Sequence, residues 1–422
     1  MIVFCRKLAF LFLFLGMLAV RNLEAKDSCV ECHLALEDNL QAPALAFTAD
    51  VHQHRGFTCV DCHGGDSSQD DPEASMNRSR GFAGKFKRVD VPKMCARCHS
   101  DANLIHKYKP QQRVDQYAQY QTSVHGKRIA SGDAAAANCV DCHSVHDIRE
   151  VKDPRSPVYP LRLPETCARC HADQSHMGKY KIPTNQFSEY RKSVHWEALA
   201  KRGDISAPNC ASCHGNHGAT PPQVGSVAAV CGTCHTMFED LYRKSPHQTA
   251  FADMGMGGCV VCHGNHAVLK PSGKMLVGPQ AVCDQCHEAD SSGGKSAVEM
   301  ADLLGRLESS LQRSDEILAV ARRSGMEVSE ALLRQQEGKE TLVKARVAVH
   351  AFQVAQVAAP VNEGMKISTE TYQAGVVALK ERGFRRMGLG FSLLAILVTM
   401  GGLWMTIRSI ESKPSNNNGG EL

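Results

Sequence analysis

The sequence predicts a mostly α-helical protein with extensive loops, in which a repetitive region precedes long C-terminal helices and one transmembrane helix. Only 6% of the 422 residues are aromatic and 43% are hydrophobic, which is little for a conventional core. Glycine, proline, asparagine and aspartate are scattered through residues 27–290, where they favour turns and short helices. No alternating apolar pattern in this region indicates a sheet. A twenty-residue uncharged run near the C-terminus predicts the membrane span.

The motif Cys-x-x-Cys-His occurs nine times and is the attachment signature of c-type haem. Its two cysteines bind the porphyrin covalently, and its histidine ligates the iron. The cysteines predicted to hold nine haems c are Cys29, Cys32, Cys59, Cys62, Cys95, Cys98, Cys139, Cys142, Cys167, Cys170, Cys210, Cys213, Cys231, Cys234, Cys259, Cys262, Cys283 and Cys286. The proximal ligands are His33, His63, His99, His143, His171, His214, His235, His263 and His287.

Two other uses of paired cysteines explain less of the pattern. Zinc ribbons take Cys-x-x-Cys pairs two at a time, but nine pairs is an odd number. Exported disulfides would use the cysteines and leave the nine histidines unexplained. Of the nineteen cysteines, only Cys5 lies outside a motif, in a segment expected to be removed. The porphyrins are therefore expected to form the core, with the polypeptide wrapped around stacked haems.

The motifs belong to an internal repeat. Each unit contains Tyr-x-x-Ser-x-His, then Cys-x-x-Cys-His-x-x-His, then a second Cys-x-x-Cys-His. Three units begin at Tyr120, Tyr190 and Tyr242, and a looser one starts at His52 or His54. The motif at Cys29 stands alone before them. Haems are thus predicted to come in pairs along the chain.

The sixth ligand decides what each haem does. Two imidazoles make an electron carrier, whereas an open position admits a substrate. Eleven histidines lie outside the motifs, close to the number that nine bis-histidine haems need. The predicted sixth ligands are His125, His195 and His247, which precede motifs, and His146, His217 and His266, which follow them. Further candidates are His52 or His54 as alternatives, and His106, His176 and His350.

The N-terminal segment predicts export. Arg6 and Lys7 precede the apolar run Leu8–Val20, and residues 23–25 form a possible cleavage site. We therefore expect a signal peptide over residues 1–25, with an uncleaved anchor as the alternative. The nonahaem domain is expected over residues 26–294.

The C-terminal helical region is expected over residues 295–386. A capping box of Ser296 and Glu299 predicts a helix that ends near Gly325. A second helix should run from about residue 329 to before Pro360, and a third from about residue 362. The apolar face of the second helix is predicted to contain Val343, Val347, His350, Val354 and Val357.

Residues 387–408 are predicted to cross the membrane, and residues 409–422 to form a disordered cytoplasmic tail. More basic residues precede the span than follow it, which opposes the positive-inside tendency. Haem attachment nevertheless indicates that the large domain lies outside. The expected location is the inner membrane, with a single span and the haem domain in the periplasm. The formal charge of +4 gives no basic surface for nucleic acid.

The repeat resembles multihaem cytochromes c of the nitrite reductase and hydroxylamine oxidoreductase lineage. The segment Lys344–His350 resembles long helices that follow the haem domain there, in which a histidine can ligate a haem. Nitrite reductases of that lineage have a catalytic haem from a motif ending in lysine, whereas all nine motifs here end in histidine. The membrane tether is similar to that of quinol-oxidising tetrahaem cytochromes, although theirs is N-terminal.

These observations favour an electron relay over a stand-alone enzyme. Electrons would come from a quinol-oxidising, quinone-interacting membrane subunit and pass to a periplasmic or outer-membrane acceptor, with other cytochromes as partners. The alternative is an oxidoreductase acting on a small nitrogen or sulfur compound at one five-coordinate haem. A relay requires two imidazoles at most irons, so the placement of the histidines separates the two hypotheses.

Overall fold

The computed structural model describes residues 27–221 and 225–412, and its regular elements within these ranges are all helical. The predicted mostly α-helical class with extensive loops is confirmed. The predicted signal peptide, with Cys5, and the tail beyond residue 412 lie outside the described residues. The chain divides into two compact units, of which the first ends at Val230 and also includes Asn265–Leu269. The second contains Cys231–Gly264 and the chain from Lys270 onwards.

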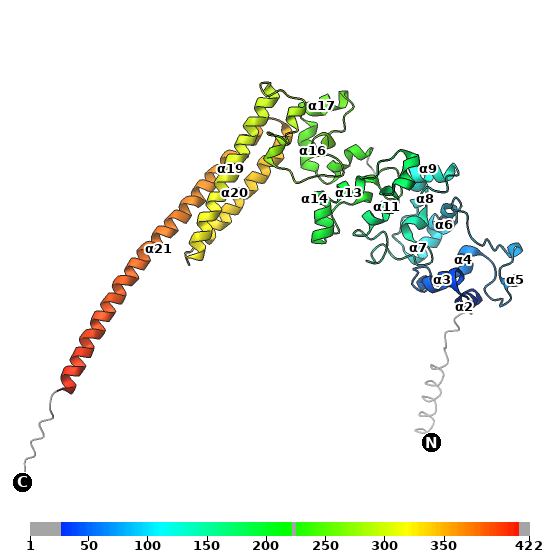
Figure 1. Ribbon diagram of the computed structural model, residues 1–422, viewed down its shortest axis with the longest axis horizontal. Coiled ribbons are helices and arrows are strands. Elements are labelled where there is room, and N and C mark those ends of the chain that lie inside the picture. The colour runs from blue at the N-terminus through cyan, green and yellow to red at the C-terminus, as the bar shows by residue number, and fades with distance from the viewer. Residues whose placement is uncertain (1–26, 222–224, 413–422) are drawn as a thin grey trace, which may run out of the picture. The chain divides into compact units, whose positions relative to one another are not determined.

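Short helices joined by loops make up the first unit (Figure 1). They are α2 (Ser28–Leu34), α3 (Asp38–Phe47), η1 (Gln53–Arg55), α4 (Cys59–His63), α5 (Pro72–Ser75), η2 (Arg78–Arg80), α6 (Val91–His99), α7 (Ala102–Tyr108), α8 (Gln116–Thr122), α9 (Val124–Ala130), α10 (Cys139–His143), α11 (Leu163–His171), α12 (Gln174–Met177), η3 (Gly178–Tyr180), α13 (Gln186–Tyr190), α14 (Val194–Trp196), η4 (Glu197–Lys201) and α15 (Cys210–His214). η5 (Val227–Thr233) spans the point in the chain where this unit ends.

The motifs form helices of two kinds. α4, α10 and α15 are single turns that coincide with the first motif of a repeat, and each begins with a capping box. In α10, for example, the Asn138 side chain accepts the Val140 N–H while Asp141 accepts the Asn138 N–H. α6 and α11 are nine residues long, begin with a proline in the first turn and end at the second motif of a repeat. The predicted short helices are therefore present, and several of them end at a motif histidine.

The second unit contains the motif at Cys231, most of the repeat that begins at Tyr242, and three long helices. Its elements are α16 (Thr236–Arg243), α17 (Pro246–Asp253), α18 (Cys259–His263), η6 (Gly273–Met275), η7 (Cys283–Gln285), α19 (Ser292–Arg323), α20 (Ser329–Ala348), η8 (Val349–Ala351) and α21 (Val354–Glu411). Figure 1 shows α19, α20 and α21 packed side by side, with α21 continuing beyond the other two.

The three long helices bury an apolar cluster centred on Leu307, Leu311, Val357 and Val361. Each fully buried leucine of this kind stabilises the fold by about 1.5–3 kcal/mol. The close approach of α21 to α19 depends on a small residue, because a Cβ at Gly364 would lie 2.9 Å from Leu307 Cδ1. These helices therefore form an ordinary protein core.

Several predicted helix boundaries are wrong. α19 starts at Ser292, because the Ser291 hydroxyl rather than Ser296 caps it by accepting the Gly294 N–H at 3.1 Å. α20 ends at Ala348, and Pro360 lies inside α21. The predicted end near Gly325 is confirmed, since this residue has φ +75°, which favours glycine.

The predicted apolar face of the second helix is also wrong. Val343 is 58% exposed, and the buried face of α20 instead carries Gln335, Gly338, Thr341 and Ala345. Gln335 Nε2 donates to the Leu311 carbonyl at 2.8 Å, so this polar face is satisfied by hydrogen bonds. The helix breaks after Ala348, which separates His350 from the earlier part of the stripe.

Candidate haem-ligand site

Motif histidines lie beside non-motif histidines throughout both units. All twenty histidines fall within the described residues. Seven pairs of rings have centroids between 5.8 and 6.1 Å apart, and each joins one motif histidine to one other. The pairs are His52–His99, His63–His146, His125–His171, His143–His217, His214–His266, His247–His287 and His263–His350.

This spacing suits an iron between the rings. A metal ion bound by two imidazoles at about 2 Å each holds the ring centroids roughly 6 Å apart. Within the described residues, the eighteen motif cysteines are all free of disulfides. The same residues contain no group of three or more His, Cys, Asp or Glu side chains that could hold a metal ion, as a zinc ribbon would need. The paired histidines beside the motif cysteines therefore fit c-type haem.

The first motif of each repeat is paired with a histidine from further along the chain. His146 follows the Cys139 motif, yet it lies beside His63 of the preceding repeat. His217 likewise lies beside His143, and His266 beside His214. Each Cys-x-x-Cys-His-x-x-His segment thus contributes its second histidine to the repeat before it.

The backbone after the motif explains this arrangement. Ser144, Gly215 and Gly264 directly follow motif histidines and have φ between 70° and 79°. A Cβ on Gly215 would lie 2.7 Å from the Thr220 carbonyl oxygen, so this turn requires glycine. Left-handed backbone turns the chain away from the motif helix, and the histidine three residues later therefore faces a different motif.

The last repeat has no following repeat, and His350 takes the corresponding place. Its ring centroid lies 6.0 Å from that of His263, with only 14° between the ring planes. His350 belongs to η8, between α20 and α21, and Phe238 packs edge-on against it at 4.8 Å. The short element between α20 and α21 thus places an imidazole beside the final first motif.

The second motif of a repeat is paired with the histidine that opens the same repeat. His125 lies beside His171, His247 beside His287 and His52 beside His99. His195 occupies the same repeat position as His125 and His247. His235, the proximal residue of the Cys231 motif, packs against Phe238 at 5.7 Å.

The tyrosine and serine of Tyr-x-x-Ser-x-His fix this histidine. Tyr120 Oη donates to the Ala137 carbonyl at 2.8 Å, and Tyr190 Oη to that of Pro208 at 2.7 Å. Ser123 caps the helix that carries His125 by accepting the Gly126 N–H at 3.0 Å. Burial raises the pKa of Tyr120, which keeps the phenol protonated as a donor. The repeat contained the signal for these roles, but only the structure assigns them.

Hydrogen-bond contacts of Nδ1 orient several of the paired imidazoles, so that Nε2 is available to ligate the iron. His63 Nδ1 lies 2.9 Å from the Gly84 carbonyl oxygen, and His350 Nδ1 lies 3.1 Å from that of Val347. His52 Nδ1 lies 2.9 Å from Asp50 Oδ1. Asp50, which sequence reasoning missed, is only 1% exposed.

The lowered pKa of Asp50 suits its role as the hydrogen-bond partner of His52 Nδ1. Burial opposes its ionisation, but hydrogen bonds from His52 and from the Ile148 N–H hold its pKa below the ordinary value. A carboxylate behind Nδ1 orients a ligating histidine and makes it more basic. The structure therefore favours His52 over His54 as the partner of His99.

Several of the paired imidazoles have a lowered pKa, which favours the neutral form that iron ligation requires. Burial, followed by repulsion from His217 and His99, lowers the pKa of His143 to about 4. Burial also lowers the pKa of His125 and of His214. These histidines can therefore bind a metal at pH 7 without first losing a proton.

Three other predicted sixth ligands have different contacts. His54 Nε2 lies 3.3 Å from the Thr48 carbonyl oxygen, and His106 Nε2 lies 3.1 Å from that of Gln112. The His176 ring lies 6.0 Å from the Tyr180 ring. His33 Nδ1 lies 2.9 Å from the Leu40 carbonyl oxygen.

Cysteines of successive motifs lie close together. The Cys95 thiol hydrogen-bonds with that of Cys139, and this bond, with burial, raises the pKa of Cys95. Cys167 and Cys210 form an equivalent pair, as do Cys231 and Cys259. In each pair the second motif of one repeat meets the first motif of the next.

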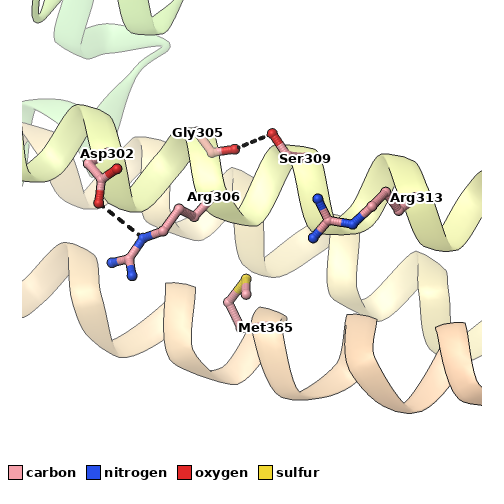
Figure 2. Close-up of a pocket in the computed structure, with 6 residues that line it drawn as sticks. All are labelled: Asp302, Gly305, Arg306, Ser309, Arg313 and Met365. Carbon is pink, nitrogen blue, oxygen red and sulfur yellow. Dashed lines mark hydrogen bonds and ion pairs between the residues drawn. The ribbon is translucent and has the colours of Figure 1, made fainter.

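Figure 2 shows a surface hollow of a different kind, lined by five residues of α19 and by Met365 of α21. Arg306 Nε lies 3.0 Å from Asp302 Oδ2, and Ser309 Oγ donates to the Gly305 carbonyl at 2.8 Å. Its lining residues include no cysteine or histidine. The hollow therefore has no place in haem attachment.

The family model of cytochrome c3 matches residues 51–172 and 204–288, which together make just under half of the chain. The matched stretches contain eight of the nine motifs, and the motif at Cys29 lies outside them. No curated protein and no solved structure matches the chain. The match and the motifs together support a multihaem cytochrome c with covalently bound haem c and a role in electron transfer.

Proposed function

We propose that this chain is a membrane-anchored, periplasmic cytochrome with nine haems, related to the nitrite reductase and hydroxylamine oxidoreductase lineage, which relays electrons between redox partners. The observation that supports it best is the set of seven imidazole pairs, each at the spacing of two axial ligands. An iron with two imidazole ligands has no position for a substrate and exchanges single electrons.

The proposed sixth ligands follow from the pairs. His146, His217, His266 and His350 serve the haems of the Cys59, Cys139, Cys210 and Cys259 motifs. His52, His125 and His247 serve those of the Cys95, Cys167 and Cys283 motifs. Haem supplies the one-electron chemistry, and these side chains set its potential through ligation and burial.

Contacts between cysteines of neighbouring motifs support electron transfer from haem to haem in the order of the motifs along the chain. Because the Cys95 thiol hydrogen-bonds with that of Cys139, haems attached at these two motifs would lie close to each other. The Cys167–Cys210 and Cys231–Cys259 contacts repeat this arrangement. Each contact links the second haem of one repeat to the first haem of the next, as a continuous relay requires.

The anchor is the C-terminal part of α21. By length and composition this helix can cross a membrane, and its apolar segment is exposed, with Phe391 75% and Leu397 65% accessible. The Arg408 guanidinium lies over the Trp404 ring at 4.9 Å, near the end of the segment. Aromatic and basic residues at this place suit a membrane interface. The proposed donor is a quinone-interacting subunit in the inner membrane, and the proposed acceptors are other cytochromes.

Mass spectrometry and a haem assay of the purified protein test the proposal. The intact mass should exceed that of the mature polypeptide by nine haems, and the oxidised spectrum should be predominantly low-spin. A protein with far fewer haems, or with several high-spin irons, would refute the relay. Reduction by membranes supplied with a quinol, abolished when the span is removed, would support the proposed donor.

A further inference from the structure

The motif Cys29–His33 has different surroundings from the others. His33 Nδ1 lies 2.9 Å from the Leu40 carbonyl oxygen, next to α3, as expected of a proximal ligand held by a second contact. Within the described residues, which include all twenty histidines, the His33 ring is not among the histidine pairs.

The position of Cys29 explains the missing partner. The Ser28 N–H donates to the Ser67 carbonyl at 3.0 Å and the Ser28 hydroxyl to the Gln69 carbonyl at 2.7 Å, so the Cys29 motif lies close to the first motif of the next repeat. Burial, Asp27 and the nearby Cys29 accordingly raise the pKa of Cys59 to about 12. This is the place of a second motif, as in the Cys95–Cys139 contact. Second motifs draw their partner histidine from earlier in the chain, whereas His33 is the first histidine of the sequence.

Four non-motif histidines lie outside these pairs. His195 has the repeat position of His125 and His247, which lie beside second motifs, and the other three have contacts elsewhere. His54 and His106 direct Nε2, the usual ligating atom, towards the carbonyl oxygens of Thr48 and Gln112. His176 lies against Tyr180 and near enough to His171 to affect its pKa. His54 is the nearest rival, since Thr48 directly follows α3.

We propose that the haem held by Cys29, Cys32 and His33 has an open sixth position that binds a small exogenous ligand. This inference rests on the proposed haem attachment and adds a binding site to the relay. The surroundings are accessible, since Cys32 is exposed and Leu34 and Leu40 are 37% and 51% exposed. Suitable ligands are small molecules or anions with a carbon or nitrogen donor atom, which bind iron without a large pocket.

Carbon monoxide and cyanide are the probes, used on the full-length protein with its haems attached. The reduced protein should bind one carbon monoxide per nine haems, and the oxidised protein should show one high-spin iron that cyanide converts to low spin. The variant Cys29→Ser/Cys32→Ser should contain eight haems and lose both signals. The His54→Ala variant should bind carbon monoxide in the same ratio as the wild type.

The outcomes separate this inference from the relay. Nine low-spin haems that bind no carbon monoxide would overturn the open position and leave the relay intact. A wild type without binding and a His54→Ala variant that binds one equivalent would identify His54 as the sixth ligand and overturn the inference. A high-spin signal that persists in Cys29→Ser/Cys32→Ser would also overturn it. A wild type that lacks haem at Cys29 would refute both this inference and the nonahaem proposal.

Discussion

Replacing His350 by alanine tests whether the helical region supplies a haem ligand. The His350 ring is 6.0 Å from that of His263, and its Nδ1 contact with the Val347 carbonyl leaves Nε2 for the iron. His350→Ala therefore removes one axial ligand from one haem of the nine. We expect one additional high-spin iron and one additional carbon monoxide bound per protein, with the haem count unchanged.

Magnetic circular dichroism and carbon monoxide titration measure this change. His106→Ala is the matched control, because His106 Nε2 faces the Gln112 carbonyl and its removal should leave both readings at the wild-type value. A His350→Ala protein with the wild-type number of low-spin haems would show that the close ring pair does not share an iron. If His350→Ala and His106→Ala gave the same number of high-spin irons and bound the same amount of carbon monoxide, ring spacing could not be taken as evidence of iron ligation.

Three further predictions concern packing, the tyrosine anchor and the membrane. Gly364→Ala places a Cβ against Thr341 Oγ1 and should lower the free energy of unfolding by about 1–3 kcal/mol in thermal melts. Gly383→Ala, on the same helix with open space around it, should be neutral or stabilising by up to about 1 kcal/mol. Tyr120→Phe loses the bond to the Ala137 carbonyl and should cost about 1 kcal/mol in chemical unfolding; an unchanged midpoint would remove its anchoring role. Deleting residues 387–422 should release the protein from membranes with its haem spectrum unchanged, and retention in the membrane fraction would contradict the anchor.

The sequence predicted the class of the fold because its signals are local. Nine short motifs, the tyrosine repeat and the long apolar run each lie within a few residues of one another. The mostly helical structure, the helices ending in motifs and the helix end at Gly325 follow from such signals.

The histidine pairing could not be predicted, because it depends on backbone turns between distant segments. His146 is three residues from His143 in sequence but lies beside His63, after a turn at Ser144 with φ 72°. The face of α20 was misjudged for a related reason. Its buried side carries Gln335, which hydrogen-bonds to both neighbouring helices, and Thr341, which donates to the Gly338 carbonyl of its own helix, so polar residues rather than the valines face the core.

The coordination of each iron, seen by crystallography or electron cryo-microscopy of the haem-loaded protein, tests the central claim most directly. The account predicts that His146 binds the iron of the Cys59 motif and His217 that of the Cys139 motif, each opposite a motif histidine. Finding His146 on the iron of its own Cys139 motif, or on no iron, would contradict it.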